Sequence, residues 1–160
     1  MTDPIIVHVL DGTQAEKLVE MTPKQKILFD LLTKRYWPGP LTVILKANLD
    51  ILPSIVTAQT GFVGIRSPRH PFARKLIETS QLPIGAPSAN LFSHVSPTEP
   101  VHVFNDFYNC EISIVDGDRC EFGVESTVVK LFDSEIHVLR EGSLSVKKLQ
   151  SFLKEKLTEE

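Results

Sequence analysis

Apolar residues along the chain follow two spacings, one typical of strands and one typical of helices. Short apolar runs predict strands, and the run at residues 4–10, rich in β-branched side chains, suits a strand buried on both faces. The other predicted strands are residues 41–46, 61–65, 82–86, 112–115, 128–132 and 136–140. Apolar residues three and four apart predict helices over residues 13–21, 23–35 and 71–79, from Pro97 or Thr98 to Phe107, and after Ser145.

The start of the second predicted helix carries the clearest local signal. Thr22 suits the N-cap, Pro23 the first helical position, and Gln25 the residue that closes a capping box. Strands and helices then alternate along the whole chain. This order predicts an α/β fold, in which ligands bind where strands end.

Composition narrows the class of protein. The chain has 160 residues, of which 42% are hydrophobic and 23% charged, which predicts one soluble globular domain. The net charge of -3 excludes an overall positive field that would attract nucleic acid or anionic lipid. No apolar stretch approaches the length of a membrane span, and the first residues do not form a signal peptide. We therefore expect a cytoplasmic protein without a membrane partner.

The two cysteines add no site of their own. Cys110 and Cys120 have neither C-x-x-C spacing nor a neighbouring histidine pair, so the sequence predicts no zinc site and no redox motif. A chain without a disulfide framework fits a reducing compartment.

Candidate chemistry is concentrated in residues 82–98. Ser88, Asn90 and Ser96 follow a predicted strand in a loop of small residues, where hydroxyl and amide groups suit phosphate or carboxylate oxygens. An ordinary surface turn explains the same residue types equally well. We keep both interpretations at this point.

Two further positions have unusual placement for their residue type. His8 is the single polar residue in the first apolar run, where a histidine is more often a core residue than a ligand. Arg66 ends a buried strand, where its charge requires an anionic ligand or a carboxylate of the protein. A ligand contact and an internal salt bridge are both consistent with this pattern.

Five motifs in order carry a resemblance to a known family. They are WPGPLT at 37–42, GIRSPRHP at 64–71, APSAN with SPT within 86–98, GVESTV at 123–128 and LREG at 139–142. Together they resemble the YrdC-type threonylcarbamoyl-AMP synthases. The resemblance implies a YrdC-like twisted mixed sheet with flanking helices around a concave cavity. It also implies an enzyme that makes threonylcarbamoyl-AMP and pyrophosphate from L-threonine, bicarbonate and ATP.

The same resemblance assigns roles to residues of this chain. It implies an L-threonine site formed by His8, Arg66, Ala86 and Ser126, and an ATP site formed by Ser88, Asn90, Ser96 and Arg140. Catalysis would depend on positioning and charge neutralisation, without a side-chain nucleophile. Mg²⁺ is expected on the phosphates, although no dedicated carboxylate cage is visible in the sequence.

The resemblance also has departures. The family's first strand, its P-T-E-T-x-Y-G-L segment and its basic Lys-x-Arg-Pro segment are not found, so we expect residues 1–160 to form a single domain that is incomplete at its N-terminus. Glu141 stands where the family has proline. The expected partners are the downstream tRNA threonylcarbamoyl transferase machinery and tRNA. The alternative is a catalytically impaired paralogue or fragment that binds tRNA, another RNA or a protein partner.

Overall fold

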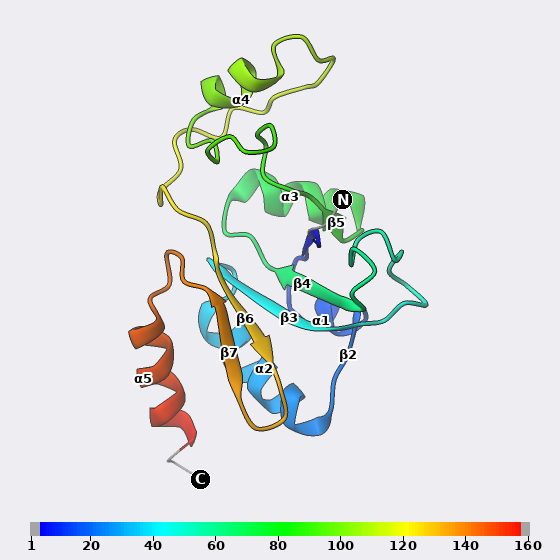
Figure 1. The fold of residues 1–160 in the computed structure, drawn as a ribbon, viewed down its shortest axis with the longest axis vertical. Coiled ribbons are helices and arrows are strands. Elements are labelled where there is room, and N and C mark those ends of the chain that lie inside the picture. Colours follow the sequence, from blue (N-terminus) through cyan, green and yellow to red (C-terminus); the bar gives the residue numbers. More distant parts are fainter. Residues whose placement is uncertain (1–3, 158–160) are drawn as a thin grey trace. The chain divides into compact units, whose positions relative to one another are not determined.

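The computed structural model describes residues 4–157 (Figure 1). The chain divides into two compact units, which are described separately here. The first comprises Met1–Ala86 together with Glu125–Glu160, and the second comprises Pro87–Val124. The expectation of a single, N-terminally incomplete domain stays a prediction.

The first unit contains a mixed sheet, as expected. The described part of the chain forms seven strands: β1 (Ile6–His8), β2 (Val19–Glu20), β3 (Leu41–Ala47), β4 (Phe62–Arg66), β5 (Ile84–Gly85), β6 (Thr127–Leu131) and β7 (Ile136–Arg140). The strand order is β5-β1-β4-β3-β6-β7, and β2 pairs with β3. The β1–β4 and β3–β6 pairs are parallel, while the remaining pairs are antiparallel. The α/β fold class is confirmed.

Within residues 4–157, four helices belong to the first unit: α1 (Gly12–Glu16), α2 (Pro23–Tyr36), α3 (Pro71–Ser80) and α5 (Val146–Leu157). The capping box at the start of α2 is confirmed. The Thr22 hydroxyl accepts a hydrogen bond from the Gln25 amide at 3.2 Å, and the Gln25 side chain accepts one from the Thr22 amide at 3.0 Å. These two bonds satisfy backbone donors that a helix start otherwise leaves unpaired.

The core lies on one face of the sheet. Because side chains alternate along a strand, Val7, Ile65, Val43 and Val129 form one row across four neighbouring strands. All four are buried and pack in one cluster with apolar residues of the helices, which are Ala15, Phe29, Leu32 and Leu149. Figure 1 shows α1 and α2 behind the strands. The opposite face is therefore available to position other chemistry.

The second unit is built around α4 (Pro100–Phe107), which Glu99 precedes as N-cap. The helix begins two or three residues later than expected. The strand predicted at residues 112–115 is wrong, since these residues form no strand and Val115 is 71% exposed. A β-strand requires a neighbour for its backbone hydrogen bonds, and no strand is found among the described residues of this unit.

Three other expectations need correction. The helical pattern at residues 13–21 gives only the short α1, because Val19 pairs with Ala47 and extends the sheet as β2. The strand at 82–86 shrinks to Ile84–Gly85, and Leu82 is largely exposed. The first strand is not buried on both faces, because Ile6 and His8 are half-buried.

The two cysteines, Cys110 and Cys120, are free and exposed. No helix within residues 4–157 has the length and apolarity to cross a membrane.

Candidate functional site

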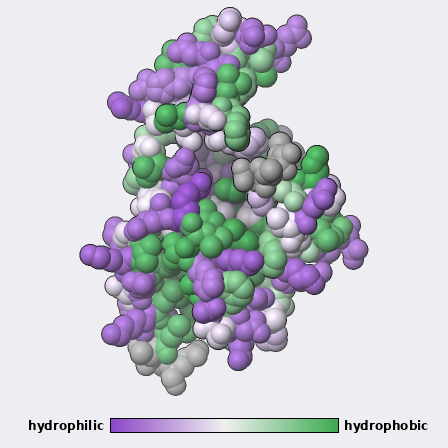
Figure 2. All heavy atoms as spheres, in the orientation of Figure 1, coloured by the Kyte–Doolittle hydropathy of each residue, from purple (hydrophilic) through white to green (hydrophobic). Residues whose placement is uncertain are grey.

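The face of the sheet opposite the core, which we call the open face, carries the predicted residues of the first unit. His8 and Arg66 are direct neighbours in the β1–β4 register, and Thr42, Val128 and Arg140 follow one another across β3, β6 and β7. Figure 2 shows hydrophobic residues gathered over the strands on the face that it presents. The open face thus combines an apolar floor with cations near the ends of its strands.

Gly64 lies in the middle of this face. A Cβ atom at Gly64 would lie 3.2 Å from the Thr42 Cγ2 atom and 3.7 Å from the Cγ1 atoms of Ile44 and Ile6. A larger residue would therefore have to displace its neighbours or rise above the floor. Glycine at this position therefore leaves the surface of the sheet beside Arg66 free of a side chain, so that a ligand can approach the backbone.

Two arginines define the electrostatics of the open face. Arg66 Nε donates to the Gly39 carbonyl at 3.1 Å, and Arg140 Nε donates to the Ser126 carbonyl at 3.1 Å. Within residues 4–157 neither guanidinium forms an ion pair with a carboxylate. Burial lowers the pKa of Arg66, and the positive charge of Arg140 lowers it further. An anion bound here would relieve this repulsion.

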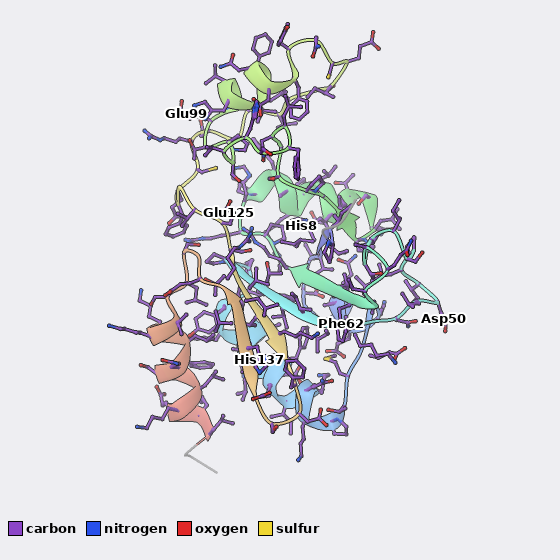
Figure 3. All side chains as sticks on the ribbon, in the orientation of Figure 1. His8, Asp50, Phe62, Glu99, Glu125 and His137 are labelled. Atoms are coloured by element: carbon purple, nitrogen blue, oxygen red, sulfur yellow. The ribbon has the colours of Figure 1, made fainter. Side chains whose placement is uncertain are left out.

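His8, labelled in Figure 3, is the direct neighbour of Arg66 in the β1–β4 register. Burial lowers its pKa below the ordinary 6.5, and the charge of Arg66 lowers it further, against the opposing effect of a hydrogen bond with Ile84. Its Nδ1 atom lies 3.3 Å from the Ile84 carbonyl oxygen, which can only accept. Nδ1 is therefore the donor, and in the neutral ring the lone pair of Nε2 is left as an acceptor.

Ser126 is almost completely buried, with 3% of its surface exposed. Its hydroxyl lies 2.8 Å from the Thr42 hydroxyl and accepts a hydrogen bond from Arg140 Nη2 at 3.3 Å. Ser126 thus holds the Arg140 guanidinium through two hydrogen bonds, one to its carbonyl and one to its hydroxyl. Thr42 is the residue that sequence reasoning missed, although it lies in the WPGPLT motif, because only the parallel β3–β6 pairing brings it to Ser126.

Two glycine turns hold these groups in place. A Cβ atom at Gly142 would lie 2.6 Å from the Ser126 carbonyl carbon, and a Cβ atom at Gly39 would overlap the Tyr36 carbonyl oxygen. Gly39 also accepts the bond from Arg66. Both glycines therefore allow a close backbone approach that a side chain would block.

The remaining predicted residues divide between the two units. In the first unit, Ala86 follows β5 and donates its amide to the Ile6 carbonyl at 3.1 Å, which ties it to β1. In the second unit, Ser88 is exposed and Asn90 uses its side-chain amide within its own loop, donating to the carbonyls of Leu91 at 2.9 Å and His94 at 3.1 Å. Ser96 is half-buried in the same loop. The structure therefore brings together His8, Arg66, Ser126 and Arg140.

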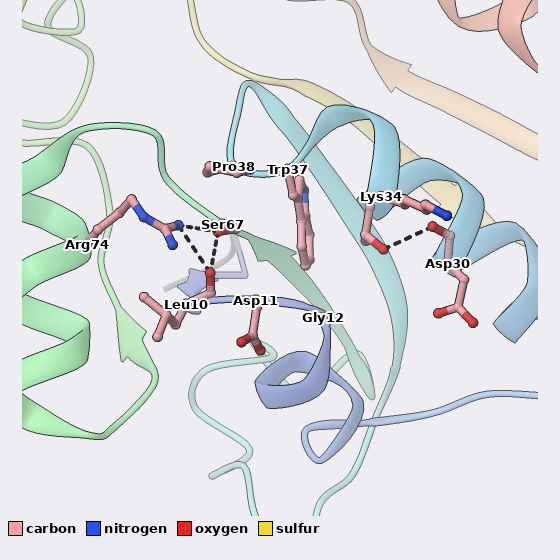
Figure 4. A pocket seen from close by; sticks show the side chains of 10 residues that line it. Leu10, Asp11, Gly12, Asp30, Lys34, Trp37, Pro38, Ser67 and Arg74 are labelled. Atoms are coloured by element: carbon pink, nitrogen blue, oxygen red, sulfur yellow. Dashed lines mark hydrogen bonds between the residues drawn. The ribbon is translucent and has the colours of Figure 1, made fainter.

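A separate pocket of about 390 Å³ in the first unit contains none of the predicted site residues (Figure 4). Trp37 forms one wall. Arg74 points into it but donates to the Leu10 carbonyl and the Ser67 hydroxyl, each at 3.1 Å. Its guanidinium therefore links α3 to two other segments of the first unit. Residues 4–157 contain no group of three or more His, Cys, Asp or Glu side chains that could hold a metal ion.

Several known proteins resemble this chain over most of its length. The family model Sua5/YciO/YrdC, described as "Telomere recombination", matches residues 1–142. The threonylcarbamoyl-AMP synthase of Pyrococcus abyssi is 39% identical over 153 residues, which cover 96% of this chain and 44% of the relative. That of Bacillus subtilis is 42% identical over 151 residues, which cover 94% of this chain and 43% of the relative.

A solved structure also matches nearly the whole of this chain. The crystal structure of P. abyssi Sua5 complexed with L-threonine superimposes with a TM-score of 0.86 at 38% identity, and the match covers 95% of this chain and 44% of that one. The chain spans less than half the length of these relatives. The matches nevertheless include nearly all of this chain, so the chain belongs to the Sua5/YciO/YrdC family.

Proposed function

We propose that the chain forms threonylcarbamoyl-AMP and pyrophosphate from L-threonine, bicarbonate and ATP. The observation that carries the proposal is the Arg66–Arg140 pair, whose two charges have no carboxylate partner among residues 4–157. The reactants and the product carry carboxylate and phosphate groups that such a pair can bind. The names of the relatives and the L-threonine complex of P. abyssi Sua5 support the same reaction.

The proposed threonine site consists of His8, Arg66, Ala86 and Ser126. Arg66 would bind the substrate carboxylate, because a guanidinium offers planar donors that match its two oxygens. Neutral His8 would accept a hydrogen bond at Nε2 from the substrate amine or hydroxyl. Ser126 would act mainly through Arg140 and Thr42, to which its hydroxyl is bonded.

The chemistry requires two new bonds. The ammonium form of threonine can first pass one proton to His8 Nε2. The neutral amine nitrogen then bonds to the carbon of bicarbonate, and the proton that nitrogen loses leaves with the bicarbonate hydroxyl as water. An oxygen of the resulting carbamate then attacks the α-phosphorus of ATP, and the bond to the pyrophosphate leaving group breaks. Holding the reactants in line and offsetting the developing negative charge supply most of the rate enhancement, so no side-chain nucleophile is needed.

The proposed ATP contacts are Ser88, Asn90, Ser96 and Arg140. Arg140 is well suited to a phosphate because Ser126 fixes its guanidinium from one side. Mg²⁺ commonly binds through substrate phosphates and keeps several waters, so we propose that it accompanies ATP and helps to neutralise the phosphates. We further propose that the product passes to the tRNA threonylcarbamoyl transferase machinery in the cytoplasm, with tRNA as a further partner.

The test measures pyrophosphate release by the purified 160-residue chain. We expect release only when ATP, L-threonine and bicarbonate are all present. Arg66→Ala should raise the KM for L-threonine by about ten-fold or more, since hydrogen bonds to charged groups contribute roughly 1.5–3 kcal/mol. Arg35→Ala, at an exposed arginine of α2, is the matched control and should leave the KM unchanged. Release without L-threonine, or none with all three substrates, would contradict the proposal.

A further inference from the structure

The loop at residues 90–96 of the second unit is folded around one carboxylate. Asp106, on α4, accepts a hydrogen bond from the Leu91 amide at Oδ2, at 2.9 Å. Its other oxygen, Oδ1, lies 2.9 Å from Nδ1 of His94. Asn90 completes the arrangement by donating to the carbonyls of Leu91 and His94. The helix thus fixes both the backbone of the loop and the histidine ring at its far end.

The arrangement determines which histidine nitrogen remains available. The hydrogen bond from the Leu91 amide, and then that from His94, lower the pKa of Asp106, so its carboxylate stays ionised and can only accept. His94 Nδ1 is therefore the donor, and Nε2 has no hydrogen-bond partner among the described residues. The side chain of His94 is 53% exposed, so a ligand in solution can reach Nε2. The neighbouring titratable group is His102, whose Nδ1 atom faces Thr98.

We propose that His94, held in place by Asp106, is a phosphate-binding residue for ATP. The inference rests on the proposed function in one respect, which is that ATP is the ligand of this loop. His94 lies between Asn90 and Ser96, both of them proposed ATP contacts. In the imidazolium form both ring nitrogens carry a proton, so that Nε2 can donate to a phosphate oxygen while Nδ1 donates to Asp106. Asp106 is a positioning residue, because it acts through His94 and the Leu91 amide.

The test compares the affinity of the whole chain for ATP and for adenosine by titration calorimetry. His94→Ala should weaken ATP binding roughly ten-fold, in keeping with the loss of one charge-assisted hydrogen bond, and leave adenosine binding unchanged. Asp106→Asn keeps an acceptor for the Leu91 amide but removes the negative charge, so it should weaken ATP binding to a similar extent. The double variant should be no weaker than the more affected single variant, because both changes remove one interaction.

The matched control is His137→Ala. His137 also pairs with a carboxylate, Glu135, at 2.8 Å, but it lies in the first unit on β7 (Figure 3). Its removal should leave the ATP affinity unchanged. Protection of the Leu91 amide from hydrogen exchange, measured by NMR, shows whether Asp106→Asn keeps the loop folded. Since His94 is exposed, His94→Ala remains informative even if the Asp106 variant unfolds the loop.

Three results would overturn the inference: an unchanged ATP affinity in His94→Ala, an equal loss of ATP and adenosine binding, or additive effects of the two substitutions. The results that would contradict the proposed reaction differ from those that would contradict the role of His94. A chain that releases no pyrophosphate, yet loses ATP affinity in His94→Ala, would contradict the synthase reaction and support the role of His94. A chain that releases pyrophosphate and binds ATP equally well without His94 would contradict this inference alone.

Discussion

Replacing Thr42 with valine tests the buried hydroxyl pair behind Arg140. Thr42 is fully buried, and its hydroxyl lies 2.8 Å from that of Ser126. Valine has nearly the same shape as threonine, so Thr42→Val removes the hydroxyl with little change in packing. The Ser126 hydroxyl keeps the donor from Arg140 but loses its partner on β3. The change therefore leaves a buried polar group incompletely bonded.

The expected cost follows from this burial. A buried hydroxyl that loses one of its hydrogen-bond partners costs up to about 1–3 kcal/mol, so the free energy of unfolding should fall by an amount in that range. In a chain of this size each kcal/mol lowers the Tm by roughly 2–4 °C. The assay is urea unfolding followed by circular dichroism, which should show a lower midpoint and an unchanged m-value. Thr13→Val, at an exposed threonine of α1, is the control and should change stability by less than about 0.5 kcal/mol.

A double-mutant cycle decides whether the two hydroxyls act as a pair. Ser126→Ala alone leaves the Thr42 hydroxyl buried without its partner, whereas Thr42→Val with Ser126→Ala removes both. The double variant should therefore lose less stability than the two single variants combined, by about 0.5–3 kcal/mol. Additive costs would refute the reasoning, since they would mean that the two hydroxyls do not depend on each other.

Three other predictions concern local structure and pH. Gly142→Ala should destabilise the chain by about 1–3 kcal/mol through overpacking against Ser126, measured by thermal unfolding, whereas Gly123→Ala, with nothing within 4 Å of its Cβ, should not. Thr22→Ala removes the capping box of α2 and should cost about 0.5–2 kcal/mol in urea unfolding; an unchanged midpoint would argue against the cap. Because the pKa of His8 is lower in the folded state than the ordinary 6.5, the unfolded state binds more protons, so stability should fall as pH decreases through 6.5. His8→Gln should reduce that slope between pH 7.5 and 5.5, and an unchanged slope would contradict a buried neutral imidazole.

Local sequence determined the elements whose stability is local. The capping box at Thr22 and the strand ending at Arg140 have the bounds that their patterns predict, since caps and apolar periodicity act over a few residues. The predicted strand at residues 112–115 is wrong for the complementary reason. Its apolar residues satisfy the pattern, but a strand exists only where another strand supplies hydrogen bonds, and the pattern does not contain that information.

The candidate site shows the same division. The sequence alone, through its motifs, assigned His8, Arg66 and Ser126 to an L-threonine site and Arg140 to an ATP site. It left open whether Arg66 meets a carboxylate of the protein, and it did not single out Thr42. Those points depend on register: the parallel β3–β6 pairing brings Thr42 to Ser126, and the fold places Arg66 near Arg140 without a carboxylate partner among residues 4–157. Residue types determined which chemistry was available, whereas strand pairing decided which groups meet, because contacts between distant residues depend on the packing of the whole sheet.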